Sequence, residues 1–250
     1  MKKSTNIEDK LYPIAAIIII LVLWQVITTT RHVPQYILPS PAKIVNTLIK
    51  DFSIIMGHTK VTLYESFIGF AISIIFSFIL AVLMDSFEII KKSIYPILVI
   101  SQTIPTIAIA PLFIIWFGFG TLPKIIVVIM VCFFPIVISL VDGFEKIDRD
   151  YISLFKTMKA SKLQSFYHLK LPYAMVNLFS GLKIAATYMI MSAVIGEWLG
   201  GDKGIGVYMV RSKNAYALDK VFASILIIVV VSILIIYIID FIGKKIIHWK

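Results

Sequence analysis

The chain has 250 residues, of which 59% are hydrophobic and only 15% are charged. Soluble domains have about 45–50% apolar and about 25% charged residues, so the composition excludes a soluble enzyme, a secreted disulfide scaffold and a disordered regulator. The net charge of +10 does not indicate nucleic-acid binding, because basic residues in membrane proteins usually reflect topology. One cysteine, Cys132, and four scattered histidines predict neither a disulfide framework nor a metal site.

Long uncharged runs predict an all-α, polytopic membrane protein. The run between Lys92 and Lys124 has 31 residues, whereas roughly 20 apolar residues cross a bilayer as a helix. Helices are expected because lipid offers no partners to exposed backbone groups. The first segment is too long for a signal peptide and lacks a clear cleavage site, so we expect it to be retained. The six predicted transmembrane helices cover residues 12–29, 59–84, 93–118, 122–141, 173–197 and 221–241.

The distribution of basic residues predicts a multi-pass protein of the cell membrane with both termini in the cytoplasm. In that orientation the cytoplasmic segments hold 14 of the 24 Lys and Arg residues and the outer segments hold 9, while Lys183 lies within a span. Cytoplasmic segments of membrane proteins carry this excess. Residues 142–172 then form the largest cytoplasmic loop.

This loop is predicted to contain two short helices. Apolar residues recur at helical spacing in two segments, at Ile152, Phe155 and Met158, and then at Leu163, Phe166 and Tyr167. Between them, Ser161 and Gln164 have the spacing of a capping box, in which each satisfies a backbone donor of the other. The pattern leaves two interpretations open, a helix pair resting on lipid headgroups or an element that docks a partner protein.

The third predicted span contains two prolines, Pro105 and Pro111, and the polar residues Ser101, Gln102 and Thr103 precede the first of them. Proline removes a backbone donor and clashes with the preceding turn, so we expect this helix to be kinked or broken. In transporters such breaks often lie near substrate or gating sites, although packing alone also produces kinks.

Two stretches resemble a known family. SQTIPTIAIAPL at residues 101–112, followed by IWFG at 115–118, is similar to the permease subunits of binding-protein-dependent ABC importers. LKLP at residues 169–172 is similar to the end of that family's cytoplasmic signature. Within the family the chain most resembles the nitrate, sulfonate and taurine group, which includes the hydroxymethylpyrimidine and riboflavin permeases.

The resemblance implies a type I ABC importer permease fold that forms the translocation pathway for a small solute. It implies two cytoplasmic ABC ATPase subunits, a second permease copy in a homodimer, an extracellular substrate-binding protein and surrounding membrane lipid. ATP and Mg would be bound by the ATPase, so this chain is expected to bind no cofactor and to be no enzyme. In agreement, the sequence has no G-x-x-x-x-G-K-[ST] motif, and GDKGIG at 201–206 is expected to be an outer loop beneath the binding protein.

The chain departs from the family signature in its first half. SLF at residues 153–155 takes the place of E-A-A, and Lys159 takes the place of a glycine. Glycine is favoured there because the turn needs a residue with positive φ. Lys159 therefore either adopts a left-handed conformation at some cost or the turn is built differently.

The resemblance and the patterns together give two sets of candidate site residues. The ATPase-coupling set is Phe155, Met158, Lys159, Ala160, Ser161, Leu163, Phe166, Leu171 and Pro172. The substrate-pathway set is Gln102, Thr103, Pro105, Tyr188, Glu197 and Trp198.

Two other functions are considered from the residues. An ion-coupled secondary transporter needs ionisable residues inside the membrane, and the candidates Glu65, Lys183 and Glu197 form no obvious relay in the sequence. An intramembrane protease needs a catalytic pair at depth, and the sequence has no such arrangement. The ABC importer permease is therefore the favoured function.

The substrate is inferred less directly. The segment GEWLG at 196–200 and the glycines after it are more similar to the pyrimidine and riboflavin permeases than to the anion permeases. With Lys183 as the only cation expected within the membrane, aromatic Tyr188 and Trp198 favour a pyrimidine, thiamine precursor or related heterocycle. The alternatives are a nitrate, sulfonate or taurine importer, and a Trp198 that serves only as an interfacial belt residue.

Overall fold

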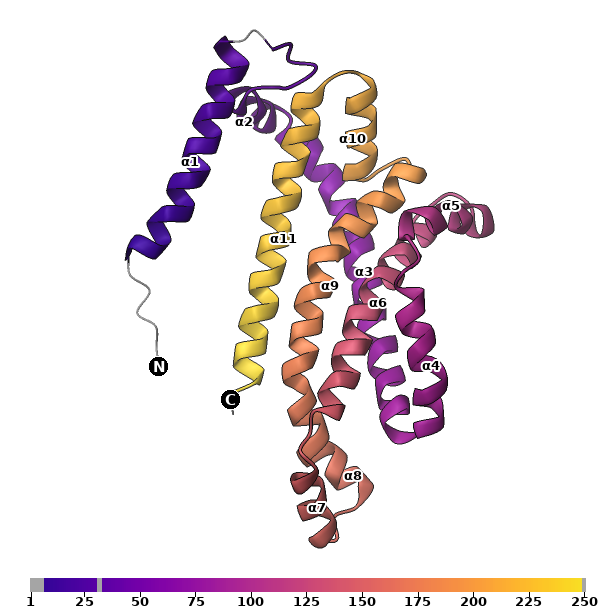
Figure 1. Ribbon diagram of the computed structural model, residues 1–250. Helices are drawn as coiled ribbons and strands as arrows, with labels where there is room; N and C mark the ends of the chain where they lie inside the picture. The colour runs from indigo at the N-terminus through magenta and orange to yellow at the C-terminus, as the bar shows by residue number, and fades with distance from the viewer. Residues whose placement is uncertain (1–6, 31–32, 249–250) are drawn as a thin grey trace. The chain divides into compact units, whose positions relative to one another are not determined.

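The structure, a computed structural model, describes residues 7–30 and 33–248. The elements in that part of the chain are helical (Figure 1). Their bounds are α1 (Ile7–Thr30), α2 (Pro41–Lys50), α3 (Phe52–Ser86), α4 (Glu88–Ser101), α5 (Thr106–Phe117), α6 (Leu122–Glu145), α7 (Arg149–Thr157), α8 (Lys162–Ser165), the π-helix η1 (Phe166–Lys170), α9 (Leu171–Leu199), α10 (Ile205–Asn214) and α11 (Leu218–Ile246). The predicted all-α class is confirmed.

The membrane-spanning helices follow the apolar runs of the sequence. Among the described residues, five helical segments are long and apolar enough to cross a bilayer, and a bent helix pair brings the number to six if it is one span. Helices α3 and α11 begin earlier than the predicted spans, at Phe52 and Leu218. Two short helices, α2 and α10, were not predicted. A serine followed by proline, Ser40-Pro41, is the N-terminal signal that marks α2.

The predicted break in the third span is confirmed and is sharper than a kink. Helix α4 ends at Ser101 and α5 begins at Thr106, and the two helices are bent by 101°. Pro105 lacks an N–H and restricts the residue before it to extended conformations. Pro111 lies inside α5 without ending it. Because each half is only 14 or 12 residues long, residues 93–118 do not form the single straight helix that the hydropathy alone indicates.

The chain divides into two compact units, which are described separately. The second unit consists of residues 58–207 together with the chain from Ile228 onward. In it α6 and α9 run side by side, with α7 and α8 beyond one end and α5 across the other (Figure 1). We call these the α7 end and the α5 end of the unit.

Glycines allow α6 and α9 to approach closely. A Cβ atom on Gly181 would lie 2.8 Å from the carbonyl oxygen of Pro135, and one on Gly143 would lie 3.0 Å from Cα of Ala174. The residue numbers rise along one helix as they fall along the other, so the pair is antiparallel. In membrane helices, where lipid competes with apolar side chains, such close backbone approach is a main source of association.

We expect Gly181→Ala to destabilise the permease by about 1–3 kcal/mol, because the added methyl overlaps atoms of α6 and forces a shift of packed backbone. Gly57→Ala is the matched control: a Cβ atom on this α3 residue has no described atom within 4 Å. There the same substitution should be neutral or slightly stabilising, because alanine favours helix. Thermal unfolding of both variants in detergent tests this, and equal unfolding temperatures would refute the packing argument.

A second small-residue stripe packs α3 on α6. Gly69, Ser73 and Ser77 recur every four residues and are buried. The Ser73 hydroxyl donates to the carbonyl oxygen of Ile129 (3.1 Å), and the Ser77 hydroxyl donates to that of Phe133 (3.0 Å). Helices α3 and α6 therefore run parallel, and α4 with α5 carries the chain from the α7 end back to the α5 end.

The first unit contains α1, α2 and parts of α3, α10 and α11. Asp51, between α2 and α3, links these two helices to α10 and α11, since its Oδ2 atom lies 2.8 Å from Nζ of Lys220 and accepts a hydrogen bond from the Tyr208 hydroxyl at 3.2 Å. The Lys220 hydrogen bond lowers the pKa of Asp51, and burial raises the pKa of Tyr208 to about 12. Asp51 is thus charged and Tyr208 neutral near pH 7, as this network requires.

Candidate functional site

The turn after α7 is closed by a backbone motif centred on Lys159. The Lys159 N–H bonds to the carbonyl oxygen of Lys156 (2.9 Å), and the Ala160 N–H bonds to that of Phe155 (3.0 Å). This is the Schellman arrangement, in which the residue after the C-cap is left-handed. Lys159 has a φ of 54°, so it adopts the conformation that glycine usually supplies. The first of the two alternatives raised by the sequence is confirmed.

Lys159→Gly should therefore retain or raise stability by about 1 kcal/mol, because a left-handed lysine carries strain that glycine does not. Lys159→Ala is the informative comparison, since it removes the charge but keeps the strained Cβ atom. We expect the glycine variant to unfold at a higher temperature than the alanine variant, with equal ATPase co-purification. If both variants lose the ATPase equally, the lysine charge is what matters and the strain argument fails.

The capping box predicted at the start of α8 is confirmed. The Gln164 N–H donates to Oγ of Ser161 (3.2 Å), and the Ser161 N–H donates to Oε1 of Gln164 (2.8 Å). These reciprocal bonds satisfy two of the donors that a helix start leaves open. The predicted order of helix, short break and helix is correct for residues 149–170.

The helix after the capping box anchors the loop to the spans. It continues as the π-helical turn η1 into α9 without a gap. Phe166 is half-buried and its ring lies 6.0 Å, centroid to centroid, from that of Phe144 on α6. Leu171 and Pro172 are half-buried in the first turn of α9. The segment from α8 through η1 is therefore connected to α6 by a ring contact and to α9 by a continuous helix.

Helix α7 has two different faces. Ile152 and Phe155 are half-buried and border a cavity on the inner side. Tyr151, Leu154 and Met158 lie on the other side with exposed fractions of 53%, 53% and 70%. The structure thus separates two residues that the coupling set joined, since Phe155 faces inward and Met158 faces outward.

The break between α4 and α5 is exposed throughout. Gln102, Thr103 and Pro105 are all exposed. The hydroxyl of Thr103 donates to the carbonyl oxygen of Ile100 (2.7 Å), which also accepts the Thr103 N–H (3.0 Å). The amide of Gln102 makes no hydrogen bond within the described residues.

The three α9 residues of the pathway set lie on different sides of that helix. Tyr188 and Trp198 are 42% and 46% exposed and share a stripe with Ile184 and Met191. Spacings of four, three and seven residues place these side chains on one face. Glu197 is only 2% exposed and lies about 100° around the helix from Trp198.

Glu197 closes the loop between α9 and α10 instead of facing an open path. Its Oε1 atom accepts from the Thr62 hydroxyl (2.6 Å), and its Oε2 atom accepts from the Gly206 N–H (2.6 Å). The Ile205 N–H in turn donates to Oγ1 of Thr62 (2.8 Å). At Gly204, where φ is 125°, a Cβ atom would lie 2.2 Å from the Glu197 carboxylate, so glycine is required at this position.

A buried ion pair adjoins this loop. Nζ of Lys124 in α6 lies 2.9 Å from Oε1 of Glu65 in α3, with side-chain exposures of 5% and 0%. The same ammonium donates to the carbonyl oxygen of Lys203 at 3.4 Å. The α5 ends of α3, α6 and α9 are therefore joined by a polar network that the sequence did not reveal.

The expectation that Lys183 is the only cation within the membrane is wrong, because Lys124 is buried inside α6. Lys183 itself pairs with Asp240 of α11. A useful signal was present in the sequence: Glu65 and Lys124 both fall within predicted spans, and charges inside a membrane usually pair. The partner could not be named without the helix packing.

Comparison with known proteins identifies the class. The chain is 35% identical over 230 residues to a probable ABC transporter permease protein of Haemophilus influenzae, covering 92% of this chain and 94% of that one. It is 37% identical over 236 residues to the formylaminopyrimidine transport permease protein ThiX of Halalkalibacterium halodurans, covering 94% and 92%. The solved structure of an amino acid ABC transporter with histidines superposes with a TM-score of 0.67 at 12% identity, covering 80% of this chain and 97% of that one.

The fold is thus that of an ABC transporter permease, a multi-pass membrane protein whose chain alternates between the two ends of a helical unit. A sequence model of the family described as binding-protein-dependent transport system inner membrane component matches residues 69–248. The chain belongs to this family and is a permease subunit of an ABC importer. In such importers a separate subunit hydrolyses ATP, and a substrate-binding protein is a further partner.

Proposed function

We propose that this permease forms one half of the translocation pathway for a pyrimidine, a thiamine precursor or a related flat heterocycle. The observation that carries the proposal is the similarity to the formylaminopyrimidine permease, which extends over nearly the whole chain. The solute would arrive from an extracellular binding protein, and a pair of cytoplasmic ABC ATPases would drive its passage.

Charges within the spans support this substrate class over an anion. Lys124 and Lys183 are each paired with a carboxylate, Glu65 and Asp240. A cation that is paired with a carboxylate attracts a nitrate or sulfonate more weakly than a free cation does. Neither of these two lysines is therefore a free cation for an anionic solute.

We assign the pathway to the exposed face of α9 and to the α4–α5 break. Tyr188 and Trp198 offer aromatic surfaces for stacking, and Gln102 and Thr103, beside Pro105, offer hydrogen-bonding groups. In the homodimer that we propose, the same face of a second copy would complete the path. Glu197 has a positioning role in this scheme, because it holds the loop at 200–206 that would lie beneath the binding protein.

We assign ATPase coupling to α7 and α8. Their loop is basic, contains helix caps and presents an exposed apolar face. These features suit a protein partner, because buried apolar side chains provide most of the binding free energy of an interface and charges fix its orientation. The loop would face the cytoplasm together with both termini, as the distribution of basic residues indicates.

The test is ligand-stimulated ATP hydrolysis by the complex of permease, ATPase and binding protein in proteoliposomes. We expect formylaminopyrimidine, thiamine or riboflavin to stimulate turnover, and nitrate, taurine and alkanesulfonates to have no effect. The converse result would exclude a heterocycle and leave an anion importer of the same family. A permease that copurifies with no ATPase would contradict the coupling assignment.

A further inference from the structure

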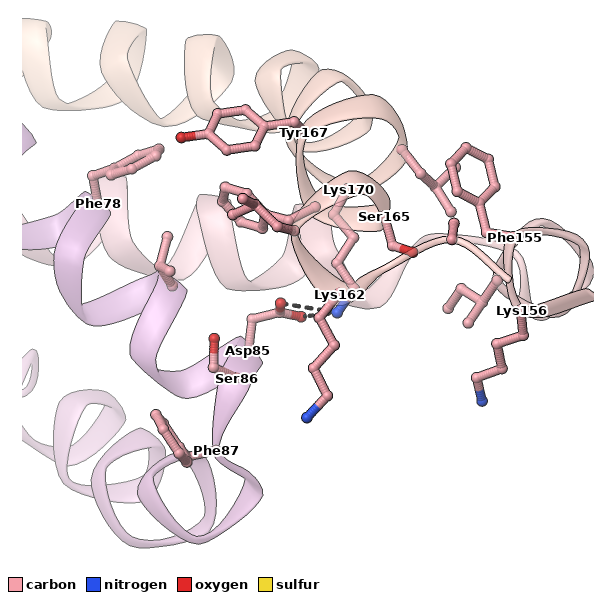
Figure 2. A pocket seen from close by; sticks show the side chains of 16 residues that line it. Phe78, Asp85, Ser86, Phe87, Phe155, Lys156, Lys162, Ser165, Tyr167 and Lys170 are labelled. Carbon is pink, nitrogen blue, oxygen red and sulfur yellow. Dashed lines mark hydrogen bonds and ion pairs between the residues drawn. The ribbon is translucent and has the colours of Figure 1, made fainter. Parts of the chain in front are cut away.

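A cavity of about 930 Å³ opens at the α7 end of the second unit. It lies between the last turns of α3 and the inner side of the loop from α7 to η1, so its walls come from segments far apart in the chain (Figure 2). Four residues of the coupling set, Phe155, Ala160, Leu163 and Phe166, also line this cavity, whereas the outward face of α7, made of Tyr151, Leu154 and Met158, does not.

One side of the cavity is basic. Lys170 and Asp85 form an ion pair, with Nζ 2.8 Å and 2.9 Å from the two carboxylate oxygens, and so neutralise each other. Lys156 and Lys162 are exposed, line the cavity and make no ion pair within the described residues. In Figure 2 their ammonium groups extend beyond the Asp85–Lys170 pair. The cavity thus carries two uncompensated positive charges.

The other side of the cavity is apolar. Phe78 and Val82 belong to the final turns of α3, a helix that crosses the membrane, and Phe166 and Tyr167 face them from η1. In Figure 2 Phe78 and Tyr167 lie on the side opposite to the ammonium groups of Lys156 and Lys162. Because α3 ends at Ser86 and a spanning helix ends near the aqueous surface, we place this change from apolar to basic wall close to that surface.

We propose that this cavity binds an anionic phospholipid, with its phosphate at Lys156 and Lys162 and its acyl chains against Phe78 and Val82. Basic pockets at the membrane boundary beside spanning helices select acidic headgroups, and lysine stems cover apolar surface while their charges reach the headgroup. A soluble phosphate would satisfy the lysines but leave the aromatic wall exposed. The leaflet is cytoplasmic if the proposed orientation holds; the binding itself depends on neither the proposed substrate nor ATPase coupling.

The test uses the purified complex of permease and ATPase, stripped of lipid and titrated with phosphatidylglycerol or phosphatidylcholine while native mass spectrometry counts bound molecules. The wild-type complex should prefer phosphatidylglycerol. Lys156→Gln with Lys162→Gln should raise the phosphatidylglycerol Kd by about 30-fold, roughly fivefold for each lysine near an anionic lipid. Phosphatidylcholine binding should not change. Lys146→Gln with Arg149→Gln is the matched control. These two substitutions remove the same amount of charge from the same loop, at exposed residues that do not line the cavity.

Three results would overturn the proposal. The first is equal affinity of the wild-type complex for the two lipids. The second is a double variant that weakens phosphatidylglycerol binding no more than the control does. The third is binding of glycerol phosphate, which lacks acyl chains, as tightly as phosphatidylglycerol. Release of the ATPase by Lys156→Gln with Lys162→Gln, at unchanged lipid affinity, would assign the cavity to the protein partner instead.

Discussion

Lys124→Met is expected to destabilise the permease by about 3–5 kcal/mol, because it leaves the Glu65 carboxylate buried without its partner. Glu65 has no exposed surface, and its second oxygen, Oε2, already lacks a hydrogen-bond partner within the described residues. Its other oxygen, Oε1, is paired with the Lys124 ammonium. The substitution therefore converts a neutral buried pair into an isolated anion between α3 and α6.

Two further variants show whether the cost comes from the isolated charge. Lys183→Met removes a lysine whose pair with Asp240 is partly exposed, at 41% and 26%; it should cost less than Lys124→Met, because Asp240 keeps its ion pair with Lys244. Glu65→Gln combined with Lys124→Met removes both charges and should recover most of the loss. Unfolding of the detergent-solubilised permease measures all three. If Lys124→Met is as mild as Lys183→Met, or the double variant is no better than the single one, the buried pair is not what holds these helices.

Leu154→Ala with Met158→Ala should abolish ATPase binding while leaving the permease folded in the membrane. Both side chains are more than half exposed on the outward face of α7, so truncating them removes no internal packing. Central apolar anchors in an interface contribute about 2 kcal/mol or more each, and losing two of them should weaken docking by roughly 10³-fold in Kd. Co-purification of the tagged ATPase and stimulated ATP hydrolysis measure the effect.

Ser153→Ala with Thr157→Ala is the matched control for that pair, because both residues are exposed on α7 but polar. It should retain the ATPase. Phe155→Ala, on the inner side of the same helix, should lower the unfolding temperature more than it lowers ATPase binding. A Leu154 and Met158 variant that keeps normal stimulated hydrolysis would show that the outward face of α7 is not the docking surface.

The sequence anticipated features that depend on neighbouring residues. Hydropathy located the spans because the length of an apolar run is set by the bilayer and not by any particular partner. Pro105 predicted the break before α5 because the lost N–H and the steric clash are local. Ser161 and Gln164 predicted the cap of α8 for the same reason, since both bonds close within four residues.

The sequence failed where the outcome depends on pairs of residues from different helices. Lys124 was counted among the basic residues of the outer segments, yet its ammonium reaches Glu65, 59 positions earlier in the chain. Glu197 was expected to face the path, but the rotation of α9 against α3 turns it toward Thr62. The two faces of α7 became distinct only in the tertiary structure, where one of them borders a cavity that α3 and η1 also line. The sequence by itself therefore determined the all-α membrane class, the approximate spans and the cap of α8, because hydrophobic length and backbone capping are local properties. Which charges are paired, which face of each helix is open and where the basic cavity lies were decided only by tertiary structure, because they depend on the register and rotation of packed helices.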